Sequence, residues 1–131
     1  MRVYLVRHAE AGPGEPDDLR TLTPAGWATA RDLGTRLAAK GARPAVVLTS
    51  PLLRARETAG ELARSLGCEV EADERLAPGT TADTLRVLVA DRGAEVVVVG
   101  HQPDCGRIAA ELTGGDAPPF PAAGMCVVEL D

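Results

Sequence analysis

The sequence predicts an α/β fold, a three-layer α/β/α sandwich with a mostly parallel central sheet. Two observations lead to this prediction. Short apolar runs rich in valine recur along the chain, and segments with apolar residues at helical spacing lie between them. Crossover helices of this kind make the strands parallel and cover both faces of the sheet. The 131 residues are expected to form one domain, residues 1–131.

The first predicted strand is followed by a loop and a helix. Residues 2–6 are a short apolar run typical of a buried strand, and residues 11–19 are rich in Gly, Pro and Asp, which indicates a loop. Thr23 is expected to cap a helix that starts at Pro24, because threonine accepts from a free N–H and proline has none to leave unpaired. Gly41 is the expected end of this helix.

Residues 46–48 predict a second buried strand, which ends just before a Ser-Pro pair. Ser50 is expected to cap, and Pro51 to open, a second helix that runs to about Leu66. This interpretation gives Ser50 a structural role and does not make it a nucleophile. The later predicted elements are a minor strand at 68–72, a helix from Thr80 to about Asp91, a strand at 95–99, a helix from Pro103 to Leu112, and a strand at 125–130.

The composition excludes several classes of function. The net charge of −5 and the aromatic share of 2% argue against binding to nucleic acid, which requires positive charge and, for single strands, aromatic stacking. No apolar run approaches the roughly 20 residues that span a membrane, and no secretory signal pattern opens the chain, so we expect a cytoplasmic protein. Three cysteines without a CxxC pair predict neither a disulfide framework nor a zinc site, and we expect all three to be small buried residues.

The chain contains two histidines, and each one stands where a predicted strand ends. Arg7 and His8 follow the first apolar run, and His101 follows the run Val96–Gly100. Ligands of open α/β sheets bind at the carboxyl ends of the strands. We therefore expect the two histidines to share one site.

Arginines at the same edge indicate phosphate chemistry. Arg54 falls near the amino end of the second predicted helix, where free N–H groups also attract anions, and Arg20 lies in the loop before the first helix. Arginine donors match phosphate oxygens, and imidazole is a competent nucleophile toward phosphorus. Each arginine taken singly is better explained as a solvated surface charge. Two histidines without a carboxylate cluster do not predict a metal site.

Four segments of the chain carry a recognisable pattern. They are Val6-Arg7-His8-Ala9-Glu10, Leu22-Thr23-Pro24-Ala25-Gly26, Ser50-Pro51-Leu52-Leu53-Arg54-Ala55-Arg56-Glu57-Thr58-Ala59 and Val99-Gly100-His101-Gln102-Pro103. These segments resemble the histidine phosphatase superfamily (branch 1, phosphoglycerate mutase-like) and stand in that family's order. Within the superfamily, the chain is most similar to the short SixA-type phosphohistidine phosphatases.

The resemblance implies a role for each candidate residue. His8 would be the nucleophile that is transiently phosphorylated, Arg7 and Arg54 would bind phosphate, His101 would bind the transferring phosphoryl group, and Arg20 would be a further basic residue near the pocket. No metal or organic cofactor is implied. The family's usual glycine after the histidine is Ala9 here, which would matter only if that residue needed a positive φ angle.

The acid that larger family members use to protonate the leaving group is not evident. Ala77 or Pro78 occupies the place where this acid is expected, and neither is acidic. The carboxylates we consider instead are Glu74, Glu10 and Asp83, and a site without an acid is the remaining alternative. An imidazole leaving group, with a conjugate-acid pKa of about 6.5, needs such help far less than an alkoxide does.

We therefore predict a phosphatase that works through a phosphohistidine intermediate and removes phosphate from phosphohistidine on a partner protein. The partner would be a phosphotransfer domain or a phosphocarrier. The alternatives are a broad phosphomonoesterase or mutase for small metabolites, and a non-catalytic module that binds phosphoproteins. The short chain offers no insertion long enough for the lid that a mutase usually needs.

Overall fold

The structure is a computed structural model that describes all residues, 1–131. A five-stranded sheet forms its centre, in the order β3-β2-β4-β1-β5. β5 pairs antiparallel with β1, and the other neighbouring strands are parallel. The strands are β1 (Arg2–Arg7), β2 (Val46–Thr49), β3 (Glu69–Ala72), β4 (Glu95–Gly100) and β5 (Met125–Glu129).

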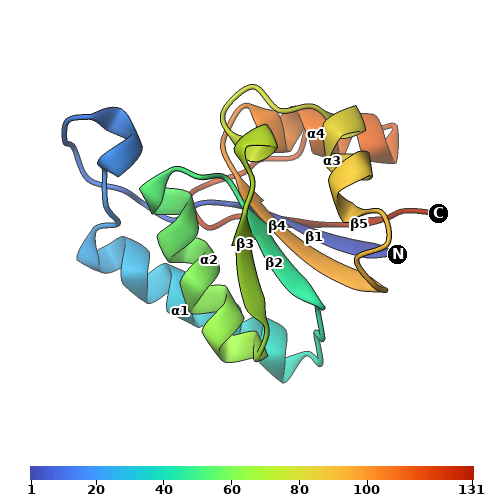
Figure 1. Cartoon of the computed structure of the whole chain (residues 1–131), viewed down its shortest axis with the longest axis horizontal. Coiled ribbons are helices and arrows are strands. Elements are labelled where there is room, and N and C mark those ends of the chain that lie inside the picture. Colours follow the sequence, from blue (N-terminus) through green and yellow to red (C-terminus); the bar gives the residue numbers. More distant parts are fainter.

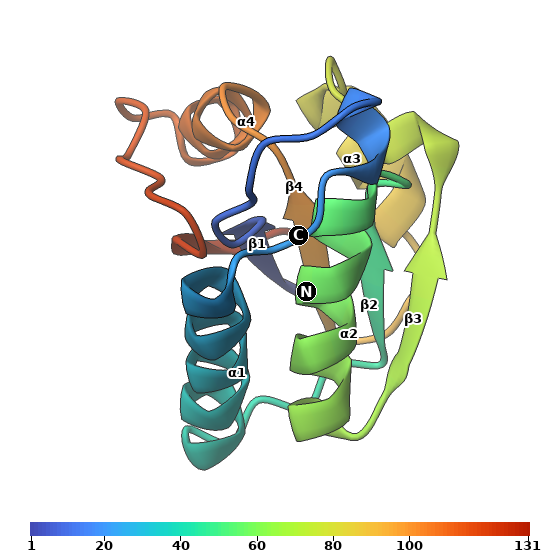
Figure 2. The same cartoon turned by 90° about the vertical axis from the view of Figure 1, so that its left-hand side faces the viewer.

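Helices cover both faces of this sheet, as Figure 1 shows. α1 (Pro24–Ala39) and α2 (Leu53–Leu66) lie side by side on one face (Figure 2), and α3 (Ala82–Val89) and α4 (Asp104–Thr113) lie on the other. Two short 3-10 helices, η1 (Asp17–Leu19) and η2 (Glu74–Leu76), complete the fold. The predicted three-layer α/β/α sandwich is confirmed. No helix is both long and apolar enough to cross a membrane.

Successive residues of the central strands pack into two separate cores, because strand side chains alternate between the two faces. In β4, Val97 and Val99 contact the core beneath α1 and α2, whereas Val96 and Val98 contact the core beneath α3 and α4. All four valines are fully buried or nearly so. Their unbroken apolar run follows from burial on both faces.

The sheet places the carboxyl ends of three strands together at its centre. β4 lies between β1 and β2, with Arg7 opposite Gly100 and Thr49 opposite Val99. The residue that follows each strand therefore lies at one edge: His8 after β1, Ser50 after β2 and His101 after β4. This edge is where α/β sheets bind ligands.

The prediction for the start of the second helix is wrong. α2 begins at Leu53, and Ser50 and Pro51 lie outside it. The Ser50 N–H still pairs with the carbonyl of Val99 in the neighbouring strand, at 3.1 Å, which is an ordinary ladder distance, so the strand pairing continues one residue past the end of β2.

Other boundaries differ at the ends of elements. The third helix spans Ala82–Val89 with Thr81 as its cap, shorter than the predicted Thr80 to Asp91, and the fourth begins one residue after Pro103. The predicted loop at 11–19 contains η1. Of the three cysteines only Cys105 is buried; Cys68 and Cys126 are partly exposed, and all are free.

Candidate active site

His8 and His101 face each other across the boundary between β1 and β4. Their ring centroids are 5.2 Å apart and their ring planes are inclined at 58°. The backbone N–H of His8 donates to the carbonyl of Gly100 at 3.0 Å, which continues the pairing of the two strands into the site. The structure thus brings together the two histidines that the sequence predicts to share one site.

The ring of His8 is fixed through its Nδ1 atom. Nδ1 lies 2.7 Å from the carbonyl oxygen of Ala9. A carbonyl can only accept, so Nδ1 carries the proton and Nε2 keeps its lone pair. The N–H of Ala9 in turn donates to the hydroxyl of Thr58, at 3.0 Å, and this hydroxyl donates to the carbonyl of Arg54, at 2.8 Å. α2 therefore orients the segment that aims the imidazole.

The start of α1 holds the same segment from the other side. The Thr23 N–H donates to the carbonyl of Glu10 at 3.0 Å, and a Cβ atom on Gly26 would overlap that carbonyl group. Glycine at position 26 is therefore required by close approach of backbone to helix. Ala9, where the family usually has glycine, has a negative φ and is fully buried, so alanine fits there without backbone strain.

Arg54 lies in the first turn of α2, where it is 8% exposed. Its guanidinium donates to the backbone carbonyl of Asp17 at 2.9 Å and to the Asp17 carboxylate at 3.3 Å. The same carboxylate accepts from Arg20 at 3.1 Å, and Arg20 also donates to the carbonyl of Gly12 at 2.8 Å. Asp17 thus joins Arg54 and Arg20 through shared hydrogen bonds.

Two buried nitrogen atoms at the site have no partner within the protein. Arg7 donates through Nη1 to the carbonyl of Phe120, at 3.0 Å, but its Nε is unpaired, and so is Nδ1 of His101. Buried polar atoms are nearly always hydrogen-bonded in folded proteins. Unpaired nitrogens on two residues beside His8 are suited to receive the oxygens of a bound anion.

Burial and positive charge keep both histidines neutral. The pKa of His8 lies below its usual 6.5, first because the ring is buried and then because Arg54, Arg7 and Arg20 disfavour a further cation. Burial and the neighbouring His8 and Arg54 lower the pKa of His101 to about 4. The paired arginines, Arg20 foremost, lower the pKa of Asp17. At neutral pH the site therefore holds two neutral imidazoles, an ionised carboxylate and three arginines.

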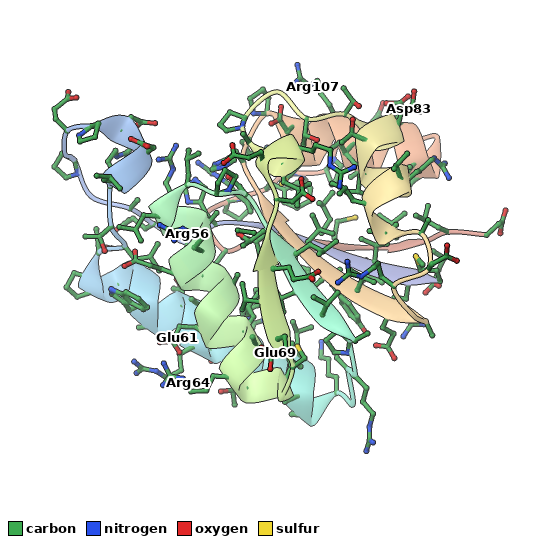
Figure 3. All side chains as sticks on the ribbon, viewed as in Figure 1. Arg56, Glu61, Arg64, Glu69, Asp83 and Arg107 are labelled. Atoms are coloured by element: carbon green, nitrogen blue, oxygen red, sulfur yellow. The ribbon has the colours of Figure 1, made fainter.

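The carboxylates considered as acids lie elsewhere or are engaged. The Glu10 carboxylate accepts from the hydroxyl of Thr23 at 2.8 Å. Glu74 is exposed on η2, and Asp83 is exposed on the first turn of α3 (Figure 3). The segment that follows η2 is tied to α4, since the Gly79 N–H donates to the carboxylate of buried Asp104 at 2.8 Å.

Surface hollows away from this site carry no comparable chemistry. The larger one lies between β3 and α3, and its charged side chains form ion pairs, Glu71 with Arg92 and Asp73 with Arg75. Nowhere in the chain do three His, Cys, Asp or Glu side chains converge as metal ligands do.

An α/β sandwich with two histidines and several arginines at the carboxyl ends of its central strands defines a class of protein suited to phosphoryl chemistry. The profile of the histidine phosphatase superfamily (branch 1) matches residues 3–78 of this chain. Phosphohistidine phosphatase SixA of Escherichia coli (strain K12) is 32% identical over 139 aligned residues, which cover 100% of this chain and 86% of SixA. The chain belongs to the histidine phosphatase superfamily, and it is a histidine phosphatase.

Solved structures agree with this assignment. The structure of the protein histidine phosphatase SixA complexed with tungstate has a TM-score of 0.91 and 30% identity, and the match covers 100% of this chain and 89% of that one. A putative phosphohistidine phosphatase SixA from Agrobacterium tumefaciens has a TM-score of 0.83 and 30% identity, covering 96% and 89%. A mycobacterial glucosyl-3-phosphoglycerate phosphatase, at 18% identity and a TM-score of 0.74, shares the fold.

Three residues that contact the site were not predicted from the sequence. Thr58 could have been found, because it lies four residues after Arg54 and therefore on the same face of a helix. Ser50 was interpreted as a helix cap, and it instead contacts His101. Asp17 stands in a polar loop, and no periodicity or motif marks it as the partner of Arg54.

We expect activity to fall as the pH is lowered through the pKa of His8, which lies below 6.5. The physical reason is that a protonated imidazole has no lone pair with which to attack phosphorus. NMR titration of the two histidine C2–H signals will measure both pKa values, and kcat/KM over about pH 5 to 8 will follow the free enzyme. A His8 signal that titrates above 6.5 would contradict this prediction.

Proposed function

We propose that this protein removes the phosphoryl group from phosphohistidine on a partner protein, through two in-line transfers. In the first transfer, the other ring nitrogen of the substrate imidazole takes a proton from solvent, Nε2 of His8 forms a bond to phosphorus, and the bond to the substrate breaks so that it leaves as neutral imidazole. In the second, a water oxygen attacks phosphorus, the bond to His8 breaks, and phosphate leaves with the remaining proton returned to solvent. Neither transfer requires a metal or an organic cofactor.

Arg7, Arg54 and His101 are the residues we assign to the three equatorial oxygens of the phosphoryl group, with Arg20 adding positive charge. This assignment is supported by the unpaired Nε of Arg7 and the unpaired Nδ1 of His101, both buried beside the nucleophile. Donors preset at the positions where charge develops contribute the largest share of rate enhancement in many enzymes. Arg54 is held by Asp17 on one side, which leaves its other donors for the substrate.

The observation that carries the proposed substrate class is the engagement of the Asp17 carboxylate, which accepts hydrogen bonds from Arg20 and Arg54. Asp17 is the carboxylate that contacts the arginines of the site, and those arginines hold its pKa below the usual value. A carboxylate in this state accepts protons poorly and has none to donate to a leaving group near neutral pH. A basic alkoxide leaving group would lose the general-acid contribution of about 10²–10⁴ in rate. Neutral imidazole leaves without such help, since its conjugate acid has a pKa of about 6.5.

The similarity to a phosphohistidine phosphatase over the whole chain supports the same substrate class. A partner of the phosphotransfer-domain or phosphocarrier type presents its phosphohistidine on a surface. The candidate residues lie at the carboxyl edge of the sheet, after β1 and β4, and such a partner would dock against this edge.

We expect kcat/KM for a phosphohistidine-bearing phosphocarrier to exceed that for phosphoglycerate by about 10²-fold or more, the contribution that a missing acid withholds from an ester with a basic alkoxide leaving group. The measurement is phosphate release from each substrate at one pH, with heat-treated enzyme as the control. A higher kcat/KM for phosphoglycerate would replace the proposal by a phosphomonoesterase or mutase for small metabolites. Binding of the phosphocarrier without phosphate release would favour a non-catalytic binding module.

A further inference from the structure

Ser50 contacts His101 directly, at a place where both side chains are shielded from water. The Ser50 hydroxyl oxygen lies 2.7 Å from Nε2 of His101. Ser50 is 0% exposed and His101 is 4% exposed. Pairing of the Ser50 N–H with the carbonyl of Val99, at 3.1 Å, fixes the backbone from which the hydroxyl projects.

The hydrogen bonds of Ser50 determine which atom donates in this contact. A serine hydroxyl has one proton to donate and two lone pairs to accept with. The N–H of Leu52 donates to the Ser50 oxygen at 3.2 Å, so one lone pair is used. Nε2 of His101 is the acceptor within reach of the hydroxyl proton. If Nε2 carried a proton instead, the buried Ser50 proton would have no acceptor, which folded proteins rarely allow.

The other nitrogen of the ring must then carry the proton. Nδ1 of His101 is buried and has no partner in the protein. We infer that Ser50 holds His101 in the Nδ1-protonated tautomer, so that a neutral imidazole presents an N–H donor to a phosphoryl oxygen beside His8. This inference deepens the proposed function and rests on it for the identity of the acceptor. It makes Ser50 a positioning residue that acts through His101.

The charges around His101 explain why the tautomer matters. An imidazolium would donate from both nitrogens whatever Ser50 did. Burial opposes that form most, His8 after β1 and Arg54 on α2 oppose it further, and together they outweigh Asp104 on α4 and Asp17 on η1. His101 is therefore neutral near neutral pH, and with the opposite tautomer it would turn a lone pair toward the phosphoryl oxygen and repel it.

The tautomer is directly observable in the substrate-free protein. Long-range proton–nitrogen correlation spectra of ¹⁵N-labelled protein near neutral pH distinguish a protonated from an unprotonated ring nitrogen. Because the chain has two histidines, a spectrum of His8→Ala assigns the remaining signals to His101. We expect Nδ1 of His101 to be protonated and Nε2 to be unprotonated. A protonated Nε2 would overturn the inference, whether or not the proposed substrate is correct.

Substitution of Ser50 tests the consequence for catalysis. We expect Ser50→Ala to shift His101 toward the Nε2-protonated tautomer and to lower kcat by about 10²-fold, the cost of one lost donor to a developing charge, with a smaller change in KM. Ser50→Thr keeps the hydroxyl and is expected to keep the tautomer and most of the activity. Thr35→Ala, which removes an exposed hydroxyl from α1, is the matched control.

The outcomes separate the inference from the proposed function. A Ser50→Ala variant that is folded by circular dichroism and keeps the Nδ1-protonated tautomer would overturn the role of Ser50. If Ser50→Ala does not fold, the wild-type spectrum still decides the tautomer. An Nδ1-protonated His101 in a protein that fails to release phosphate from phosphohistidine would overturn the proposed function and leave the inference about Ser50 in place.

Discussion

Replacement of His8 by alanine is expected to reduce phosphatase turnover by at least about 10⁴-fold, the scale on which loss of a catalytic nucleophile acts. The physical reason is that the Nδ1 proton of His8 is engaged by the Ala9 carbonyl, at 2.7 Å, so that Nε2 keeps the lone pair that attacks phosphorus. Without this imidazole, the protein cannot form the phosphohistidine intermediate that water hydrolyses. The measurement is phosphate release from a phosphohistidine-bearing substrate by wild type and His8→Ala at equal concentration.

Trapping of the intermediate provides the control for this prediction. Wild-type protein quenched during turnover of a ³²P-labelled substrate should carry a label that is lost in acid and retained in alkali, as expected of a phosphorus–nitrogen bond. His8→Ala should carry no label although it is folded and still binds phosphate through its arginines. Retained turnover in His8→Ala would remove His8 from the role of nucleophile. Equal binding of substrate by both proteins, with no label on either, would indicate a binding module.

Replacement of Arg54 by alanine is expected to lower kcat/KM by about 10³-fold or more, as found for arginines that stabilise transferring phosphoryl groups. Arg54 is almost fully buried, so its charge is only weakly screened and its donors are held in place by Asp17. Removal of the guanidinium also leaves the Asp17 carboxylate beside the site with Arg20 as its remaining partner, which repels an incoming phosphate. Steady-state kinetics on the phosphohistidine substrate will measure the loss.

Arg56 is the matched control for Arg54 on the same helix. Its side chain is exposed near the amino end of α2 (Figure 3), and it takes part in no ion pair. Arg56→Ala removes the same charge from the protein and should leave kcat/KM within a few-fold of wild type. Arg54→Lys should fall between wild type and Arg54→Ala, because lysine keeps the charge and loses the forked geometry. Equal losses from Arg54→Ala and Arg56→Ala would show a general effect of charge and would contradict the assignment.

The central part of the fold was predictable because local pattern and tertiary environment agree there. The valines of β4 form an unbroken apolar run, which is the pattern of a strand buried on both faces, and the structure buries them all. Thr23 and Pro24 start α1 as predicted, with the Thr23 hydroxyl accepting from the Gly26 N–H at 3.0 Å. In each of these elements the residues that indicate the structure lie within a few positions of one another, so one short segment is enough to predict it.

The start of α2 was predicted wrongly because two interactions compete for Ser50. A serine before a proline favours a helix cap when the segment is considered alone. In the folded protein the Ser50 N–H pairs with Val99 and its hydroxyl contacts His101, so the helix starts at Leu53, two residues after the predicted start at Pro51. A prediction from the local sequence cannot include His101, because it lies 51 residues away from Ser50.

The sequence by itself determined the alternation of strands and helices, and it determined that His8 and His101 follow directly after two buried strands. Covalent linkage to those apolar runs brings both histidines to the same edge of the sheet wherever the sheet forms. Only the tertiary structure decided that Ser50 contacts His101 at 2.7 Å and that Asp17 holds Arg54 at 2.9 Å. These contacts join residues 51 and 37 positions apart, and hydrogen bonds form only within a few tenths of an ångström of the right distance. No local pattern specifies such a distance, because packing of the whole sheet against its helices sets it.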